Sequence, residues 1–323
     1  MNDGDVRADR GTESGARGMA TSLGDGLWLL DLEFQGRRGV VAAFLLAGGG
    51  ELALIETGPT STLPVLLTGV RAAGFDPADI TALLLTHIHL DHAGAAGVLV
   101  RDLLPRATVH VHPIGAPHLV EPGKLLASAT RIYGDRMDSL WGEMVPVPAE
   151  RVLPLEDGQP LSVAGRVLTA IFTPGHASHH VTYWDAAAGT AFTGDVGGIR
   201  MQGTDYVCPP TPPPDLDPEA WARSVGRLRE LAARRLCLTH FGCYDDAAVH
   251  LDRLLPELDV FQDLATGALR GGADQEALTA ILHDRMADQL HAGPETLVNL
   301  EWATPSYMAA LGMTRLLTKR GVV

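Results

Sequence analysis

The residues of this chain best suited to chemistry lie in one short run after an apolar segment. His87, His89 and Asp91 alternate along the chain, and His92 follows directly. Imidazole and carboxylate groups are ligands of zinc and its first-row neighbours. In an extended segment, alternate side chains point to the same side, so the first three can converge while His92 points toward a second volume. One loop could therefore supply ligands to two metal ions.

Further ligands must come from elsewhere in the chain, because a metal site is not completed by four neighbouring residues. Three candidates, His176, Asp195 and His240, each lie just after a predicted strand. Loops at one edge of a sheet are a common place for a rigid scaffold to gather distant functional residues. We therefore expect these three side chains to join the first group.

These seven residues resemble the motifs of the metallo-β-lactamase-fold hydrolase superfamily, and the resemblance covers about residues 25 to 245. It implies an α/β (α+β) fold, an αββα sandwich of two mixed β-sheets flanked by helices, with a two-metal site at one edge. It also implies a distribution of ligands. The first metal would be held by His87, His89 and His176, the second by Asp91, His92 and His240, with Asp195 as the bridge.

Two positions depart from the usual pattern of the family. Glu56 stands where an aspartate is usual, and we expect its carboxylate to support the metal loop from behind the ligands. Asp195 stands where the antibiotic-degrading lactamases commonly have cysteine. The aspartate version is closer to glyoxalase-II-type thioesterases and lactonases, so β-lactam hydrolysis is not the favoured native task.

The expected chemistry is hydrolysis. A water between two divalent ions loses a proton near neutral pH and attacks a small ester, thioester or lactone carbonyl, with Asp91 orienting it or moving its proton. Zinc is the favoured metal, although the same ligands accept iron or manganese. Two alternatives stay open: an iron-dependent oxidoreductase resembling persulfide dioxygenases, and a phosphodiesterase. A binding module without catalysis would be expected to have lost ligands.

Substrate contacts are harder to infer than metal ligands. His118 lies on a loop before a predicted helix, and loops often carry function. Met201 and Tyr206 precede a proline-rich segment, 208–218, that could shape the rim of a pocket or serve as a rigid connector. We expect all three residues to contact a small-molecule substrate.

Composition restricts the class of protein. The chain has 323 residues, of which 46% are hydrophobic, enough for one large domain with a small appendage. A net charge of −14 disfavours partners such as nucleic acid or an anionic membrane. No apolar run is long enough to cross a bilayer. Three cysteines, an odd and sparse count, argue against disulfides and fit a cytoplasmic location. A homodimer is left open.

Periodicity and turn residues predict the order of elements. Residues 1–24 are expected to be a disordered tail, 25–245 the sandwich, and 246–323 a helical C-terminal extension. This extension could line the substrate site, pack on the sandwich or form a dimer interface. Strands are predicted at 27–32, 40–46, 52–55, 82–85, 108–112 and 167–172. Helices are predicted at 62–73, 93–104, 124–144, 249–264, 274–290 and 295–317.

Overall fold

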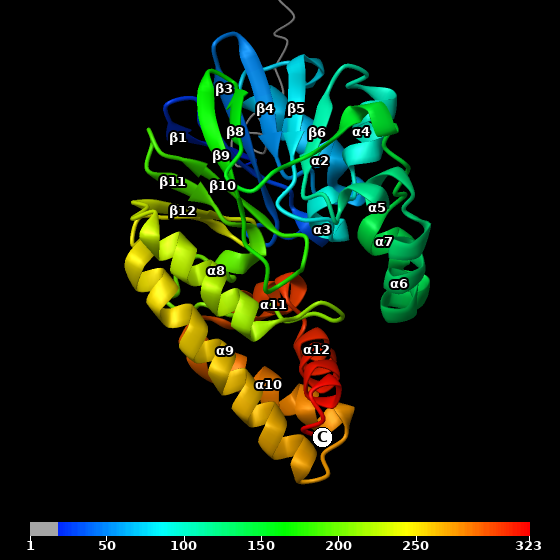
Figure 1. The fold of residues 1–323 in the computed structure, drawn as a ribbon, viewed down its shortest axis with the longest axis vertical. Coiled ribbons are helices and arrows are strands. Elements are labelled where there is room, and N and C mark those ends of the chain that lie inside the picture. Colours follow the sequence, from blue (N-terminus) through cyan, green and yellow to red (C-terminus); the bar gives the residue numbers. More distant parts are fainter. Residues whose placement is uncertain (1–18) are drawn as a thin grey trace, which may run out of the picture.

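Two β-sheets packed face to face form the centre of the computed structural model, which describes residues 19–323 (Figure 1). The first sheet contains, in spatial order, β1 (Ala20–Gly24), β2 (Leu27–Asp31), β3 (Ala42–Gly48), β4 (Glu51–Ile55), β5 (Ile80–Leu84), β6 (Thr108–Val111) and β7 (Val152–Pro154). The second contains β13 (Gly242–Tyr244), β12 (Arg235–Leu238), β11 (Thr190–Phe192), β10 (Val181–Asp185), β9 (Arg166–Phe172) and β8 (Pro160–Val163). The predicted two-sheet sandwich is confirmed.

Both sheets are mixed. Strands β1 to β4 are antiparallel, whereas β4 to β7 are parallel. The second sheet is antiparallel except where β11 pairs with β12. Apolar side chains from both sheets fill the space between them, and the rings of Phe44 and Phe192 meet there at 5.4 Å. This apolar layer fixes the two sheets so that loops from both reach the same edge.

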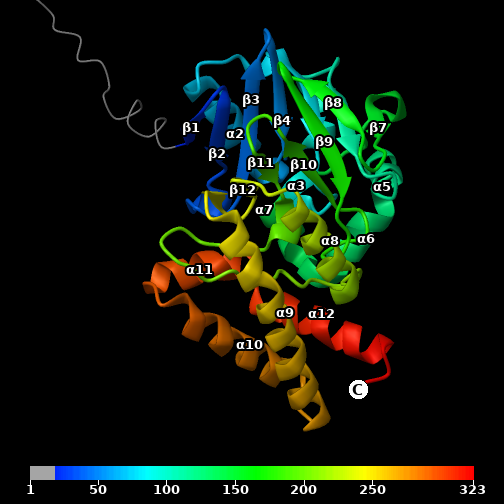
Figure 2. The same ribbon diagram turned by 60° about the vertical axis from the view of Figure 1, so that its left-hand side comes forward.

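Helices cover the outer faces. The first sheet packs against α2 (Leu63–Ala72), α4 (Ala96–Asp102) and α5 (Ala116–Val120), and the second against α8 (Pro218–Glu230) and α9 (Ala247–Arg270). The C-terminal helices are α10 (Gln275–Leu290), α11 (Pro294–Ala303) and α12 (Ser306–Lys319). Figures 1 and 2 show that α9, α10 and α12 extend from one end of the sandwich.

Three predicted boundaries differ from the structure. The residues of β1 pair with β2 and are not part of a disordered tail, while residues 1–18 lie outside the described part of the chain. The helix predicted at 124–144 is two helices, α6 (Gly123–Tyr133) and α7 (Met137–Trp141), because Gly134 adopts a left-handed φ of 53°. The helix predicted at 295–317 is broken at Thr304, since the following Pro305 disfavours a helical conformation there.

The expectation of unpaired cysteines was wrong for two of the three. Cys237 and Cys243 form a disulfide, because β12 and β13 place them directly opposite each other with Cα atoms 4.2 Å apart. Cys208 is free and buried. Among the described residues, no helix combines the length and the apolar character needed to cross a membrane.

Candidate metal centre

The seven predicted ligands come together at one edge of the sandwich. His87 and His89 lie on the loop after β5, and Asp91 and His92 lie in the single turn α3 (Leu90–Ala93) that follows it. The second sheet supplies the other three. His176 follows β9, Asp195 follows β11, and His240 lies between β12 and β13. Each ligand is therefore held by the end of a buried strand, as the sequence predicted.

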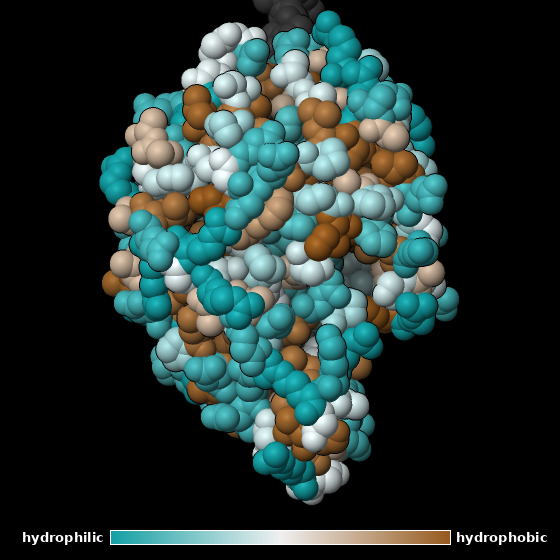
Figure 3. Space-filling view, viewed as in Figure 1, coloured by the Kyte–Doolittle hydropathy of each residue, from teal (hydrophilic) through white to brown (hydrophobic). Residues whose placement is uncertain are grey.

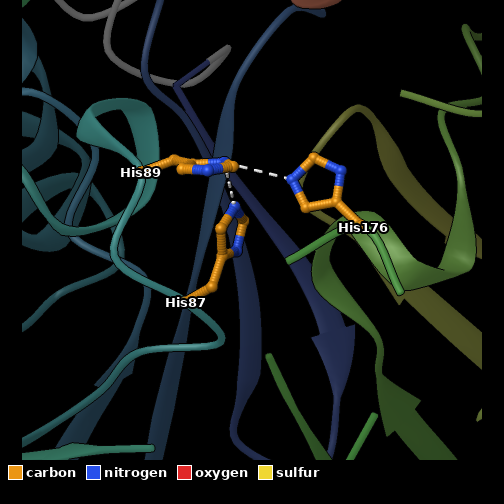
Figure 4. Close-up of side chains that lie close together, drawn as sticks. All are labelled: His87, His89 and His176. Carbon is orange, nitrogen blue, oxygen red and sulfur yellow. Dashed lines mark hydrogen bonds between the residues drawn. The ribbon is translucent and has the colours of Figure 1, made fainter. Parts of the chain in front are cut away.

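Three histidines form the first group of candidate ligands, and their ring nitrogens face one another (Figure 4). The Nε2 atom of His87 lies 2.9 Å from Nδ1 of His89, and Nε2 of His176 lies 3.1 Å from the same atom. Such a convergence of imidazole nitrogens offers three lone pairs to one cation.

The second group consists of Asp91, His92 and His240. Oδ2 of Asp91 lies 3.4 Å from Nε2 of His240 and 3.8 Å from Nε2 of His92. Asp195 lies between the two groups. Its Oδ1 is 3.3 Å from Nε2 of His92, and its Oδ2 is 3.4 Å from Nε2 of His176. One carboxylate thus presents one oxygen to each group, the arrangement that a bridging ligand requires.

The outward-facing nitrogens of the ligands are fixed by the surrounding chain. Nδ1 of His240 lies 2.7 Å from the carbonyl oxygen of Val40, and Nδ1 of His176 lies 2.9 Å from that of Pro210. A carbonyl oxygen can only accept, so each Nδ1 carries the proton and each Nε2 turns a lone pair toward the cluster. Hydrogen bonds of this kind orient the rings of metal-binding histidines.

Glu56 lies behind the ligands, where the sequence placed it. Its carboxylate accepts hydrogen bonds from the hydroxyl and the backbone N–H of Thr86 and from the hydroxyl of Thr239. Its Oε1 is also 3.0 Å from Nδ1 of His92. Glu56 therefore connects the His87 loop, the turn α3 and the His240 loop. Sequence reasoning missed the two threonines, although each directly precedes a ligand histidine.

The donor atoms fit divalent cations. Nε2 of His92, Nε2 of His240 and Oδ1 of Asp195 are buried and have no hydrogen-bond partner. A buried polar atom without a partner costs about 1–3 kcal/mol, so three that face the same small volume call for a common partner. Nitrogen and oxygen donors in this number are typical ligands of zinc, iron and manganese. The unsatisfied atoms therefore support metal binding by these residues.

The two groups differ electrostatically. Burial lowers the pKa of His89 to about 4 and holds that of His87 well below its ordinary value, so both rings are neutral and able to bind a cation. Burial also lowers the pKa of His92, but the charges of Asp195 and Asp91 outweigh it and raise that pKa well above the usual range. Without a metal, the second group thus retains protons that a metal ion would displace.

A cavity of about 320 Å³ opens over His89, Asp91, His176 and Asp195. Three segments form its walls: the α6 and α7 region, the proline-rich segment that begins at Cys208, and the junction of α11 with α12. Figure 3 shows a notch in the outline of the molecule between the α6 side and the C-terminal helices. The C-terminal extension therefore forms part of the wall of this cavity, as does the proline-rich segment.

The three predicted substrate contacts have different outcomes. His118 lines the cavity. Met201 is 2% exposed and packs in the core beneath the C-terminal helices, and the Tyr206 hydroxyl donates to Glu257 at 2.8 Å. Neither of these two lines the cavity, because the side chain of Met201 packs in the core and that of Tyr206 is directed to Glu257. Sequence reasoning missed His179, which does line it and was signalled only by its closeness to His176.

The fold and site together define a scaffold that gathers histidine and aspartate ligands at the edge of two packed sheets. Residues 36–240 match the model of the metallo-beta-lactamase superfamily, and the chain therefore belongs to this superfamily. At the level of class, this confirms the prediction of a metal-dependent hydrolase. The assignment rests on most of the sandwich and includes all seven predicted ligands.

Curated relatives share part of the sequence. A metallo-beta-lactamase fold-containing protein of Sulfurisphaera tokodaii is 29% identical over 58% of this chain and 72% of its own length. An atrochrysone carboxyl ACP thioesterase of Aspergillus fumigatus is 30% identical over 59% of this chain but 47% of its own length. A hydroxyacylglutathione hydrolase of a Synechococcus species is 26% identical over 73% of this chain and 76% of its own length.

A solved structure extends the similarity to nearly the whole chain. A metallo-beta-lactamase family protein of Thermus thermophilus aligns with a TM-score of 0.64 and 26% identity, covering 93% of this chain and 95% of its own. This coverage includes the C-terminal helices, so the combination of sandwich and helical region recurs in another member of the superfamily.

Proposed function

We propose that this protein is a hydrolase that uses two divalent metal ions, zinc by preference, to cleave a small ester, thioester or lactone. The position of Asp195 carries the proposal, because its two oxygens face two separate groups of donors. The buried, unpartnered atoms around it support the binding of cations. The similarity to a thioesterase and to a hydroxyacylglutathione hydrolase supports acyl substrates.

Two bound ions would supply Lewis acidity and would lower the pKa of a water held between them. The chain's own contribution is positioning. The side chain of Asp91 is 20% exposed, whereas those of His92 and His240 are at most 1% exposed. The carboxylate is ionised, because although burial raises its pKa, His92 and His240 lower it to about 2. Asp91 can therefore accept a hydrogen bond from a water that enters through the cavity and orient it toward a carbonyl.

The cavity wall supports a small acyl substrate. Apolar side chains such as Leu125, Ile132 and Trp141 form one side, and the prolines form the other. Walls of this kind bury hydrocarbon and exclude bulk water, while a few polar groups orient the substrate. The nearby ligand cluster lies at the floor, so a bound acyl group presents its carbonyl to the cluster.

Metal analysis and a substrate panel test the proposal. Protein purified without added metal should contain about two zinc ions per chain by elemental analysis. It should hydrolyse thioesters, esters or lactones faster than phosphodiesters or a β-lactam. A single redox-active iron per chain with no hydrolysis would indicate the oxidoreductase alternative. Turnover of phosphodiesters alone would indicate the phosphodiesterase alternative. Either result would overturn the proposal.

A further inference from the structure

Gly312 is a buried glycine in the interior of the C-terminal helix α12. Glycine is one of the least favourable residues inside a helix, so its presence at a buried position calls for a packing reason. A Cβ atom at Gly312 would lie 1.8 Å from the carbonyl oxygen of Thr211 and 3.1 Å from the carbonyl carbon of Pro212. The backbone of α12 therefore lies directly against the backbone of the proline-rich segment, and no side chain fits between them.

The peptide group just before this contact orients a candidate metal ligand. The carbonyl oxygen of Pro210 accepts the hydrogen bond from Nδ1 of His176 at 2.9 Å, and Nε2 of the same ring lies 3.1 Å from Nδ1 of His89. Pro210 and Thr211 are both buried. Proline on each side of Thr211 fixes two φ angles, so a shift at Thr211 is not absorbed by the neighbouring backbone. It reaches the Pro210 carbonyl instead.

We propose that Gly312 is a positioning residue of the metal centre. Because it has no side chain, α12 can press on Thr211 and hold the Pro210 carbonyl where it orients His176. The inference rests on the proposed metal binding and not on hydrolysis of any particular substrate. Neither Gly312 nor Thr211 lines the cavity, so this role of α12 is separate from its place in the cavity wall.

The contact concerns only one of the two groups of donors. His176 belongs to the first group, with His87 and His89. In the second group, His240 is oriented by the carbonyl oxygen of Val40, which lies in the first sheet's half of the sandwich and not in the proline-rich segment. A change at Gly312 should therefore weaken the binding of one metal ion and leave the other in place.

Gly312→Ala tests the inference on the metal-loaded protein. A Cβ atom does not lie closer than about 3 Å to a carbonyl oxygen, so Thr211 or the helix has to move by more than about 1 Å. Loss of a hydrogen bond that orients a ligand typically weakens metal binding 10–100-fold. Competition with a chelator should show one zinc ion bound at least about tenfold more weakly, with the affinity for the other unchanged.

Cobalt(II) in place of zinc shows which ion is affected. The imidazole N–H protons at Nδ1 of His176 and His240 give separate, paramagnetically shifted NMR signals when each ring binds cobalt(II). In Gly312→Ala the His176 proton should exchange faster with water, because its acceptor has moved, whereas the His240 proton should keep its protection. A general loss of stability would not distinguish these two protons.

Gly267→Ala is the matched control. Gly267 lies in helix α9, and an added Cβ atom would meet nothing within 4 Å. The substitution is the same and also lies inside a helix, but it touches no segment that holds a ligand. Both zinc affinities and both imidazole signals should stay as in the wild type.

A second variant keeps the inference testable if Gly312→Ala does not fold. The start of α12 is held by Glu301, whose Oε2 accepts from the backbone N–H of Ser306 at 3.0 Å and from its hydroxyl at 3.3 Å. Glu301→Ala removes these bonds at the helix end and should weaken the same zinc ion by about threefold. Glu295→Ala, at an exposed position in the first turn of α11, is its control.

The outcomes separate the inference from the proposed function. Unchanged zinc affinities in folded Gly312→Ala, or an equal loss at both ions, would overturn the inference and leave metal binding in place. If that variant is unfolded, unchanged affinities in Glu301→Ala have the same meaning. A wild type that binds two zinc ions but hydrolyses no acyl substrate would overturn the hydrolase function alone. A wild type that binds neither zinc nor cobalt(II) would overturn both.

Discussion

In the ligand cluster, the imidazoles are held from behind by strand and loop atoms, as His240 is by Val40 and His176 by Pro210. The cavity wall above it consists mainly of apolar side chains from helices and of the proline-rich segment, in which the Pro210 carbonyl also accepts the hydrogen bond from His176. The first region is fixed by directional bonds to buried elements, and the second by packing.

This difference suits the two regions to different tasks: metal binding in the cluster and substrate selection at the cavity wall. Metal binding needs donors placed within a few tenths of an ångström, which hydrogen bonds to strand ends can provide. Substrate selection needs shape and a few polar contacts, and helices and loops can vary these without disturbing the cluster. Changes in the cluster should therefore alter metal content, whereas changes in the wall should alter substrate preference alone.

The largest effect is expected from removal of the bridge. Asp195→Ala deletes the one carboxylate that faces both groups of donors. Metal affinity should fall more than about 100-fold, because even the groups that only orient ligands are worth 10–100-fold. Elemental analysis and hydrolysis rates measure the result. Asp102→Ala, at an exposed ion pair with Arg101, is the control. Normal metal content in Asp195→Ala would remove this residue from the centre.

A smaller loss is expected when the support behind the ligands is changed. Glu56→Gln keeps the size of the side chain but replaces one acceptor oxygen by a donor, which faces the donors of Thr86, Thr239 or His92. Metal affinity, measured by competition with a chelator, should fall about 10–100-fold. Glu33→Gln, at a surface pair with Arg38, should leave affinity unchanged. Equal affinities in the two variants would contradict the support role of Glu56.

Acidification should distinguish the two groups of ligands. A proton competes with a metal for each histidine, so affinity falls by about tenfold per pH unit and per proton once the pH drops below the histidine's pKa. The pKa of His92 is raised by Asp195 and Asp91 despite burial, whereas that of His89 is lowered to about 4. As the pH falls, the ion at His92 should therefore leave first. Metal content after dialysis at a series of pH values measures this, and simultaneous release of both ions would contradict it.

The smallest effect is expected at the cavity wall. Ile114 lines the cavity and is 52% exposed, so Ile114→Ala should change the free energy of unfolding by no more than about 0.5 kcal/mol. The KM for an apolar acyl substrate should rise about threefold to tenfold, because buried hydrocarbon contact is lost. Val167→Ala is the control, since Val167 is 60% exposed and does not line the cavity. A loss of metal in Ile114→Ala would break the division between cluster and wall.

The two regions also differ in how far the sequence predicts them. His87, His89, Asp91 and His92 are close together in the chain, and chemistry rather than packing explains such a run. The other three candidate ligands, His176, Asp195 and His240, could be predicted because each directly follows a predicted strand. The predicted substrate contacts Met201 and Tyr206, in contrast, proved to be packing residues, because nothing in a single sequence tells which side of a loop faces a cavity.

The boundaries of the helices are likewise hard to predict from a single sequence. The apolar pattern continues through Gly134 and Pro305, yet the chain bends at both places and the resulting corners border the cavity. Periodicity detects apolar faces but not their interruption by a single backbone conformation. The disulfide was missed for a related reason. Cys237 and Cys243 are brought together only by the pairing of β12 with β13.

The amino-acid sequence by itself determined the ligand types, their order and the strands that precede them, because coordination chemistry and alternation act over a few residues. The tertiary structure decided that Asp195 lies between two groups, that Glu56 joins three loops, and that α12 meets the segment that orients His176. These facts depend on the packing of two sheets and the C-terminal helices, which joins residues more than a hundred positions apart. Such contacts arise from the summed burial of many side chains, and no local pattern records them.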